Sequence, residues 1–509
     1  MSVNKFVSVE QAVALIRDGD TVALVGGGGG LVEATCLHAA VEKRFLETGR
    51  PTNLTVVHSL GIGDEKERGL NRFAHKGMVK RVIGGHWRWS PRMQALARAE
   101  QIEAYSLPGG VIMQLFREIG AGRPGVLTHV GLGTFADPRY EGGRMNRSAQ
   151  EPLVEVAHIA GQELLLYKSF PVHVALLRGS YADAEGNVSL AEETANVDIF
   201  AVALAAHNSG GKVIVQVRGA VDVGSLPARE VRIPGALVDA VVVDPNQAMT
   251  YEVVYDPTLS GERRGPVPVE LPEPFSPRQI IARRAYSELR EGAVLNFGFG
   301  IPDAVAKLIA VRGQQARYYA TIEHGTYGGT MLTGDLMGFV RNPTAMIDGP
   351  SQFDFYAGGG LDLAFLGFGE FDAAGNVNVS KLGGATVGPG GFVDIAQNAK
   401  KVVFCGTFDT KGTQIETGDG QLRVKRHGTV RKFVAQVEQI TFSGQAALQR
   451  GHEIMCITER AVFQLTPHGV VLTEVAPGVD AQSDVIARMG FAPLVPAEPR
   501  LMSAEFFSK

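Results

Sequence analysis

TVALVGGGGGLVEATCLHAAVEKRFLE, residues 21–47, contains the pattern on which the fold prediction rests. Residues 21–25 form an apolar run that predicts a strand, and the five glycines at 26–30 predict a loop. The stretch from Leu31 onward predicts a helix that begins directly after the loop. A strand, a glycine loop and a helix in this order are typical of α/β proteins, and free N–H groups at such a helix start favour anions. No Gly-Lys-Ser/Thr follows, so the loop is not a P-loop, and it is either a binding loop or a tight turn.

The same layout returns in the second half of the chain. AVLNFGFGIP, residues 293–302, predicts a strand and a glycine loop, and residues 303–313 predict a helix. Two further pairs of stretches correspond in the same order: DAEGNV at 183–188 with DAAGNV at 372–377, and AAHNSGGKVIV from Ala205 with IAQNAKKVVF from Ile395. A turn of the Asp-x-x-Gly-Asn kind is common in proteins. Three pairs of similar stretches that occur in the same order in both halves nevertheless indicate an internal duplication. We predict two related α/β domains, each an open mixed or parallel sheet flanked by helices, with an insertion in the first half at roughly residues 80–165.

A cluster of prolines marks the predicted boundary between the two domains. It consists of Pro257, Pro266, Pro268, Pro272, Pro274 and Pro277. Such a density predicts an extended linker on the surface. We therefore expect an N-terminal domain at 1–255, a linker at 256–278 and a C-terminal domain at 279–509. Ser8 with Gln11, and Ser276 with Pro277, predict the starts of the first helix in each half.

The composition is that of a globular protein. The chain has 509 residues, of which 45% are hydrophobic and 20% charged. Its net charge of −4 gives no reason to expect a nucleic-acid partner. Three widely separated cysteines suggest reduced core residues in a cytoplasmic protein and predict no metal site. We expect neither a signal peptide nor a membrane span, because the N-terminus lacks a charged and apolar leader and no apolar run reaches 18 residues.

The stretch ATIEHGTYGGT, residues 320–330, carries the main candidate for chemistry. Glu323 ends an apolar, strand-like run, and glycines follow at 325, 328 and 329. Glycine enters positive φ without steric cost, so these residues predict a sharp turn that holds Glu323 at the mouth of a sheet. A carboxylate in this place is a nucleophile, a general base, a ligand or a solvated turn residue.

Motifs in both halves resemble the family I CoA-transferases, specifically the single-chain acetate/propionate type. In the second half they are IEHGTYGG, SQFDFYAGGGLDLAFLG, GNVNVSKLG, GPGGFVDIAQNAKKVVFCGTF, ITERAVF and EVAPGVD; in the first they are LVGGGGGLVEA, VIGGHW, SLPGG with Gln114, and AHNSGGKVIVQV. The resemblance covers almost the whole chain. It implies an enzyme that moves CoA from an acyl-CoA to a free carboxylic acid, either a short-chain or a 3-keto acid, and so a role in short-chain fatty acid metabolism.

The resemblance implies a ping-pong mechanism in which Glu323 is the nucleophile and a glutamyl-CoA thioester is the intermediate. Each step passes through a tetrahedral oxyanion that needs N–H donors. The candidates are Gly388, Gly390 and Gly391 in the GPGG loop, and Gly26, Gly27 and Gly28 in the first glycine run; both loops could also be passive turns.

Substrate-binding residues follow from the same resemblance. Gln114 matches the family's polar contact to the carboxyl end of the substrate. His324 and Tyr327 are bulkier than the family pattern after the nucleophile, so we expect them to shape the acyl pocket. Gly359 and Gly360 are further candidates for the substrate site. No metal and no cofactor other than CoA, the substrate, is expected, and the family implies a homo-oligomer, a dimer or a tetramer.

Two alternatives remain at this point. One is an acyl-CoA hydrolase, in which water attacks the same glutamyl thioester. The other is a non-catalytic CoA-binding or sensor protein on the same scaffold, although a sensor would be expected to have lost Glu323 or the glycine turns.

Overall fold

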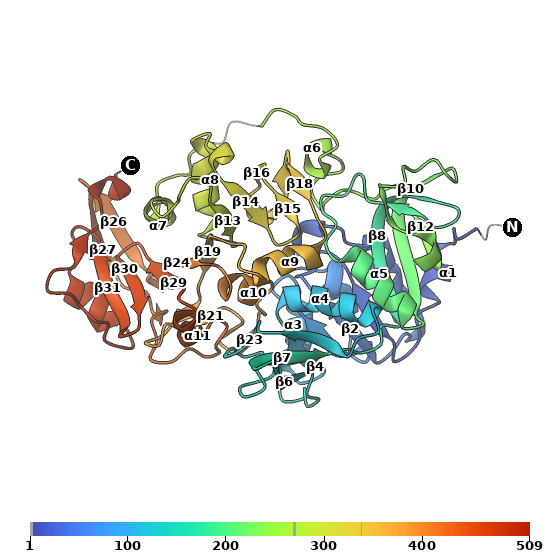
Figure 1. The fold of residues 1–509 in the computed structure, drawn as a ribbon, viewed down its shortest axis with the longest axis horizontal. Coiled ribbons are helices and arrows are strands. Elements are labelled where there is room, and N and C mark those ends of the chain that lie inside the picture. Colours follow the sequence, from blue (N-terminus) through green and yellow to red (C-terminus); the bar gives the residue numbers. More distant parts are fainter. Residues whose placement is uncertain (1–3, 268–270, 337, 509) are drawn as a thin grey trace. The chain divides into compact units, whose positions relative to one another are not determined.

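The computed structural model describes residues 4–267, 271–336 and 338–508 (Figure 1). The chain divides into two compact units. The first consists of Met1–Pro266, Glu323–Asp354 and Gly384–Asp394, and the second of Val267–Ile322, Phe355–Gly383 and Ile395–Lys509. The first boundary falls inside the predicted linker. Two segments of the second half, however, pack with the first unit, so the compact units differ from the ranges 1–255 and 279–509.

The first unit is built on a mainly parallel sheet. Its central strands run in the order β10 (Lys212–Val221), β8 (Val174–Asp183), β1 (Thr21–Leu24), β2 (Leu54–His58), β3 (Val79–Gly84) and β4 (Glu103–Ser106). All of these neighbours pair in parallel, and β12 (Ala240–Val243) adds to β10 (Figure 1). Every residue of β1 is buried, which explains why the residues after Thr21 are all apolar. The predicted strand, glycine loop and helix at 21–47 correspond to β1, the turn η1 (Gly28–Gly30) and α2 (Thr35–Thr48). The prediction that the helix begins at Leu31, directly after the glycines, was wrong: residues 31–34 are not helical, and Val32 has a positive φ of 50°.

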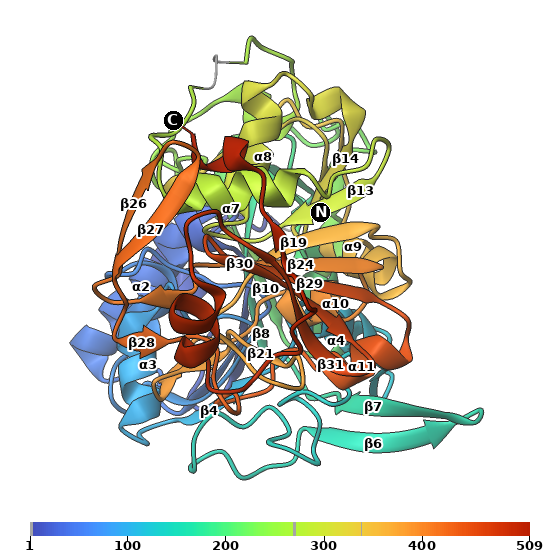
Figure 2. The ribbon, with the colours of Figure 1, turned by 90° about the vertical axis from the view of Figure 1, so that its left-hand side faces the viewer.

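Helices and a small second sheet complete this unit. The helices are α1 (Val9–Val13), α3 (Pro91–Arg98), α4 (Gly109–Gly120) and α5 (Ile199–Asn208). The capping box predicted at the first helix is present: Gln11 N donates to Ser8 Oγ, and Ser8 N donates to Gln11 Oε1. The antiparallel sheet of β5 (Gly125–Thr128), β7 (Gln162–Lys168) and β6 (Val154–Ile159) lies in the predicted insertion (Figure 2).

The second unit contains a mixed sheet. Its strands run in the order β14 (Tyr319–Ile322), β13 (Val294–Phe297), β19 (Leu363–Gly367), β24 (Lys401–Cys405), β29 (Glu453–Ile457), β30 (Ala461–Thr466), β31 (Gly469–Val475) and β32 (Arg500–Leu501). Pairing is parallel from β14 to β29 and antiparallel from β29 through β31. Helices α7 (Pro277–Tyr286), α8 (Asp303–Val311) and α11 (Gly444–Gln449) belong to this unit, and β26 (Gln414–Gly418) and β27 (Gln421–Arg426) form a hairpin (Figure 2). Both units are therefore α/β, as predicted.

The two halves of the chain share a local pattern. The order β10–β8–β1–β2 in one sheet matches β24–β19–β13–β14 in the other, and each set is parallel. The turns at Asp183 and Asp372, which have similar sequences, also share their hydrogen bonds. The Asp183 carboxylate accepts hydrogen bonds from the N–H groups two and four residues further on, and so does Asp372. This repetition is what an internal duplication predicts.

Part of the predicted linker is folded. Residues 257–260 form α6 (Pro257–Ser260), which is capped by Asp256. Asn342 N donates to Thr258 O, and Asn342 also exchanges two hydrogen bonds with Gly265. These contacts are made by residue 342, far along the chain, so proline density alone could not indicate them. Residues 268–270 of the linker lie outside the described residues. Near the C-terminus, a π-helical turn and a 3-10 turn follow one another, η6 (Ala481–Val485) and η7 (Ile486–Arg488).

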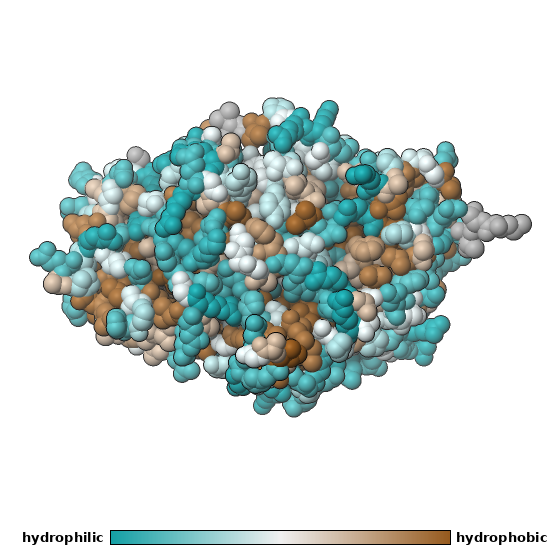
Figure 3. Space-filling model, viewed as in Figure 1, coloured by the Kyte–Doolittle hydropathy of each residue, from teal (hydrophilic) through white to brown (hydrophobic). Residues whose placement is uncertain are grey.

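The surface shown in Figure 3 mixes hydrophilic residues with smaller apolar groups, as expected for a globular chain of this composition. Across the described ranges, no helix combines the length and apolar character that a bilayer crossing would require.

Candidate active site

Glu323 is held by a turn in which glycine is required. It directly follows β14, and Gly325 has a φ of 98°. A Cβ at Gly325 would lie 2.1 Å from Ile347 O, and Ile347 N donates to Gly325 O at 2.8 Å. The short strands β15 (Thr326–Tyr327) and β18 (Ala345–Met346) pair next to this contact. The backbone therefore fixes where the Glu323 side chain starts.

The GPGG loop is anchored by main-chain hydrogen bonds. Gly390 N donates to Gly85 O at 2.7 Å, and Gly109 N donates to Gly390 O at 2.7 Å. The Gly388 carbonyl lies 3.0 Å from His86 Nδ1. Gly388 and Gly390 both have positive φ, of 75° and 56°, which favours glycine at these positions. The loop is thus positioned by the end of β3 and the start of α4.

The structure brings Glu323 and Gly391 into contact. A Cβ at Gly391 would lie 2.1 Å from Glu323 Oε2, and the Gly391 N–H donates to the Glu323 carboxylate. Burial raises the pKa of Glu323 to about 7, and the Gly391 hydrogen bond acts in the opposite direction. The Glu323 side chain still keeps 28% of its surface exposed. A carboxylate in this setting is reachable, and an N–H that contacts it can also contact an oxyanion formed on its carbonyl carbon.

His324 packs beside Glu323 as a neutral ring. Its Nε2 lies 3.9 Å from Glu323 Oε1, and only 12% of its side chain is exposed. A Cβ at Gly338 would lie 2.7 Å from His324 Cε1, so the ring is closely covered there. Burial lowers the pKa of His324 to about 4. His324 therefore does not neutralise Glu323 near pH 7. Tyr327, two residues after Gly325, is half-buried.

Asp394 is a site residue that the sequence analysis missed. Its carboxylate accepts a hydrogen bond from Gly110 N at 3.2 Å, at the start of α4. Pro108, the residue before that helix, offers no side-chain cap. Burial raises the pKa of Asp394 to about 8, and the nearby charge of Glu323 raises it further. In the sequence, Asp394 is simply an aspartate three residues after the GPGG loop, and nothing there indicates a partner 284 residues away.

Gln114 is also on α4, one turn beyond Gly110. Its Nε2 donates to Asp354 Oδ1 at 2.9 Å, and Arg117 Nη1 donates to Asp354 Oδ2 at 2.6 Å. The Gln114 amide has two N–H groups, so the bond to Asp354 fixes the orientation of the amide and leaves one N–H for a substrate carboxylate.

The first glycine run packs against bulky side chains. Gly27 exchanges two main-chain hydrogen bonds with Leu31. A Cβ at Gly28 would lie 2.4 Å from Trp89 Cε2, and a Cβ at Gly26 would lie 2.5 Å from Glu33 Cγ. Because glycine has no side chain, Gly26 and Gly28 leave room for Glu33 and Trp89 of the same unit.

Gly359 and Gly360 fall in the second unit, where they end helix α9 (Gly349–Ala357). Gly359 N donates to Tyr356 O, and Gly360 N donates to Phe355 O. A Cβ at Gly360 would lie 2.4 Å from the Phe355 ring. Their observed contacts are those of a helix terminus.

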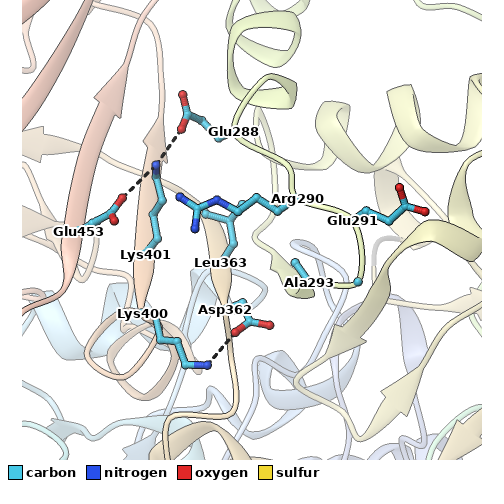
Figure 4. Close-up of a pocket in the computed structure, with 10 residues that line it drawn as sticks. Glu288, Arg290, Glu291, Ala293, Asp362, Leu363, Lys400, Lys401 and Glu453 are labelled. Atoms are coloured by element: carbon cyan, nitrogen blue, oxygen red, sulfur yellow. Dashed lines mark hydrogen bonds and ion pairs between the residues drawn. The ribbon is translucent and has the colours of Figure 1, made fainter.

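A cavity of about 300 Å³ in the second unit lies at the amino ends of β13, β19, β24 and β29 (Figure 4). Five of its charged groups pair with one another: Lys401 Nζ contacts Glu288 and Glu453, and Lys400 Nζ contacts Asp362. Glu291 pairs with Arg317, outside the lining. In α/β sheets ligands bind outside the carboxyl ends of the strands. Position and charge pairing therefore give no reason to place substrate here.

Comparisons with known proteins identify the family of the chain. A family model described as Coenzyme A transferase matches residues 6–244. Acetate CoA-transferase YdiF of Escherichia coli O157:H7 is 40% identical over 501 residues, which cover 98% of this chain and 94% of that protein. Caffeate CoA-transferase of Acetobacterium woodii is 43% identical over 514 residues, covering 99% and 98%. The crystal structure of the YdiF apoenzyme from E. coli O157:H7 superposes with a TM-score of 0.95 at 39% identity, covering 100% of this chain and 96% of that one. The chain therefore belongs to the coenzyme A transferase family, whose reaction transfers CoA between an acyl-CoA and a carboxylate.

Proposed function

We propose that Glu323 is the nucleophile of this CoA-transferase and that it carries CoA as a glutamyl thioester between two half-reactions. Its carboxylate attacks the thioester carbonyl of an acyl-CoA, which releases CoA thiolate and leaves an acyl-glutamyl anhydride. The thiolate then attacks the glutamyl carbonyl carbon, which releases the free acid and forms the glutamyl-CoA thioester. An incoming carboxylate takes the CoA by the reverse steps.

The observation that supports this most is the contact between Glu323 and the Gly391 N–H. Each attack creates a negative oxygen on the reacting carbonyl, and a preorganised N–H stabilises such an oxygen. Gly388 and Gly390 are proposed to hold this N–H in place, since their backbone is pinned to Gly85 and His86. Gly26, Gly27 and Gly28 remain weaker candidates for the oxyanion, because their close contacts are with packing side chains.

The acyl pocket is proposed to be narrowed by His324 and Tyr327. The position of the His324 ring 3.9 Å from Glu323 supports this, and so does its neutral state. Gln114 is proposed to orient the carboxyl end of the substrate, and Gly359 and Gly360 remain candidates for further substrate contacts. The identity of the acids is proposed only as short-chain or 3-keto carboxylic acids. The relatives differ in the acid that they use, since one is an acetate CoA-transferase and another a caffeate CoA-transferase.

A mass adduct on one peptide tests the proposal. Incubation with acetyl-CoA and no acceptor should attach CoA to the peptide that contains residues 321–329. A crystal structure of the 39% identical E. coli O157:H7 enzyme is described as a thioester complex with CoA, which supports this choice of assay. Glu323→Gln keeps the size of the side chain but removes the nucleophile, and should give no adduct. An unmodified peptide in a protein that still exchanges CoA would contradict the mechanism. Release of free CoA without exchange, measured alongside, would favour the hydrolase alternative.

We also propose that the chain arose by duplication of one α/β domain, with 1–255 and 279–509 as its two copies. The matching strand orders and the matching turns at Asp183 and Asp372 support this. A superposition of the two four-strand sets that left these turns out of register would contradict it. We further propose a cytoplasmic homo-oligomer, a dimer or a tetramer, on the basis of the family. Sedimentation as a monomer at micromolar concentration would exclude the oligomer.

A further inference from the structure

A second cavity, of about 290 Å³, opens in the first unit. Six of the residues that line it are Gly30, Arg68, Arg72, Arg178, Thr250 and Tyr251. Three of these are arginines, and none of the described residues that line the cavity carries a carboxylate side chain. Its volume is near the lower end of the range for small-molecule sites, which suits a compact ligand.

The cavity lies at the topological switch point of the first sheet. β1 and β8 are parallel neighbours, but the chain leaves β1 through α2 toward β2 and leaves β8 through α5 toward β10, on the opposite side. Leu24 at the end of β1 pairs with Leu176, so Arg178 lies on β8 just beyond the end of β1. In open α/β sheets the crevice outside the carboxyl ends of two such strands is the usual ligand site.

Arg178 supplies a fixed charge at the base of the cavity. Its side chain is only 3% exposed, and it forms an ion pair of 3.0 Å with Glu193. Its Nη2 also donates to Ala248 O at 2.8 Å. These partners hold the guanidinium in place and occupy most of its donors, so Arg178 is a support and not the main ligand donor.

Arg68 and Arg72 offer the donors that remain. The Arg68 guanidinium lies 4.7 Å from the centre of the Tyr251 ring, and its nearest carboxylate, Asp64, is 3.8 Å from Nε. Within the described part of the chain, no hydrogen bond involves Nη1 or Nη2 of Arg68. Arg72 uses Nη1 for Glu42, and no described group hydrogen-bonds to its Nη2.

Glu33, which contacts the lining residue Tyr251, is held largely neutral. Glu33 accepts hydrogen bonds from Tyr251 Oη at 2.5 Å and from Gly63 N at 2.9 Å, and it is fully buried. Burial raises the pKa of Glu33 to about 8. An anion in the cavity would therefore meet three guanidinium groups and little opposing charge from Glu33. Arg178 and Arg72 are already paired with Glu193 and Glu42, so Arg68 supplies most of the uncompensated positive charge.

We propose that this cavity binds a compact oxyanion, either a phosphate group or a small dicarboxylate, through the free N–H groups of Arg68 and Arg72. The planar guanidinium matches the oxygens of both ligand types in pairs, and arginine retains its charge at all physiological pH values. The site goes beyond the chemistry at Glu323 and uses none of its residues.

Titration calorimetry on the full-length protein tests this site, with inorganic phosphate in one arm and succinate in the other, at constant ionic strength. One saturable site per chain is expected in at least one arm. Arg68→Gln and Arg72→Gln should each raise the Kd about 10- to 100-fold, the effect of removing a hydrogen bond to a charged group. The arm that binds more tightly identifies the type of oxyanion.

Two control variants distinguish binding in this cavity from non-specific attraction by positive charge and from binding at Glu323. Arg88→Gln removes an exposed arginine paired with Glu65, outside the cavity, and should leave the Kd unchanged. Glu323→Gln should also bind as wild type, even if the proposed thioester mechanism fails. Absence of saturable heat in both arms would overturn the proposal, and so would equal Kd values in Arg68→Gln and Arg88→Gln. Loss of binding in Glu323→Gln would place the anion elsewhere. Thermal melting checks folding. Arg68→Gln is decisive because Arg68 is exposed, and among the described residues its guanidinium contacts Asp64 at 3.8 Å and the Tyr251 ring.

Discussion

Replacing Gly391 with alanine tests the contact between the glycine loop and Glu323 directly. A Cβ at position 391 would lie 2.1 Å from Glu323 Oε2 and 2.9 Å from the Phe353 ring. Nonbonded heavy atoms settle about 3.5 Å apart, so the carboxylate or the loop must move by roughly 1 Å or more. A misplacement of that size can cost about 10²-fold in rate, and loss of one oxyanion donor costs about 10²- to 10³-fold. We expect kcat/KM for Gly391→Ala to fall by about 10²- to 10³-fold.

The assay is CoA exchange from acetyl-CoA to a panel of free carboxylic acids, with melting curves to confirm folding. Gly390→Ala is the control for backbone strain, because its Cβ would meet only His86 carbons at 3.8 Å or more while its φ is 56°. It should lose less activity than Gly391→Ala. Gly418→Ala, with no atom within 4 Å of the new Cβ, should behave as wild type. If a folded Gly391→Ala keeps the wild-type kcat/KM, the contact has no part in catalysis and the reasoning fails.

Three further predictions concern the same site. Because burial raises the pKa of Glu323 to about 7, kcat/KM should rise with pH and level off above about 7. Because this pKa is higher than the ordinary value of 4.5, the unfolded chain loses the Glu323 proton first as pH rises. The free energy of unfolding of wild type should therefore fall relative to that of Glu323→Gln, by about 2–3 kcal/mol between pH 4.5 and about 7 in melting experiments. Equal pH profiles for the two proteins would contradict a buried, perturbed carboxyl. Asp394→Ala uncaps α4 and should cost about 1 kcal/mol of stability together with activity, whereas Asp394→Asn keeps an acceptor for Gly110 N and should retain more of both. His324→Ala should raise kcat/KM for bulky acids relative to acetate while the CoA adduct still forms, and an unchanged acid preference would remove His324 from the acyl pocket.

Local signals in the sequence were sufficient for many elements of the fold. The apolar run before Gly26, the capping residues Ser8 and Gln11, and the Ser276–Pro277 start of α7 each depend on neighbours within a few residues. The turn at Gly325, two residues after Glu323, was also predicted from nearby residues, since this glycine adopts the positive φ that a sharp turn requires. These features were predicted because their causes are short-range.

The partners of these residues were not predictable in the same way. Asp394 caps a helix 284 residues earlier in the chain, and Asp354 holds Gln114 across 240 residues. The segments Glu323–Asp354 and Gly384–Asp394 pack with the first unit, although a division by sequence order assigns them to the second half. Hydrophobic periodicity and turn propensity describe single elements and contain no information about such pairings.

The two glycine loops show why a motif could suggest the site but not assign its parts. In both loops the absence of a Cβ allows another group to approach closely, and in the sequence both are simply glycine runs. At Gly28 the approaching group is the Trp89 indole, and at Gly391 it is the Glu323 carboxylate. An indole at that distance uses the space for packing, because its carbon atoms gain only dispersion energy there. A carboxylate uses the same space to reach a backbone N–H, which is the arrangement that acyl-transfer chemistry needs. The role of a glycine loop therefore depends on which side chain, from a distant part of the sequence, packs against it.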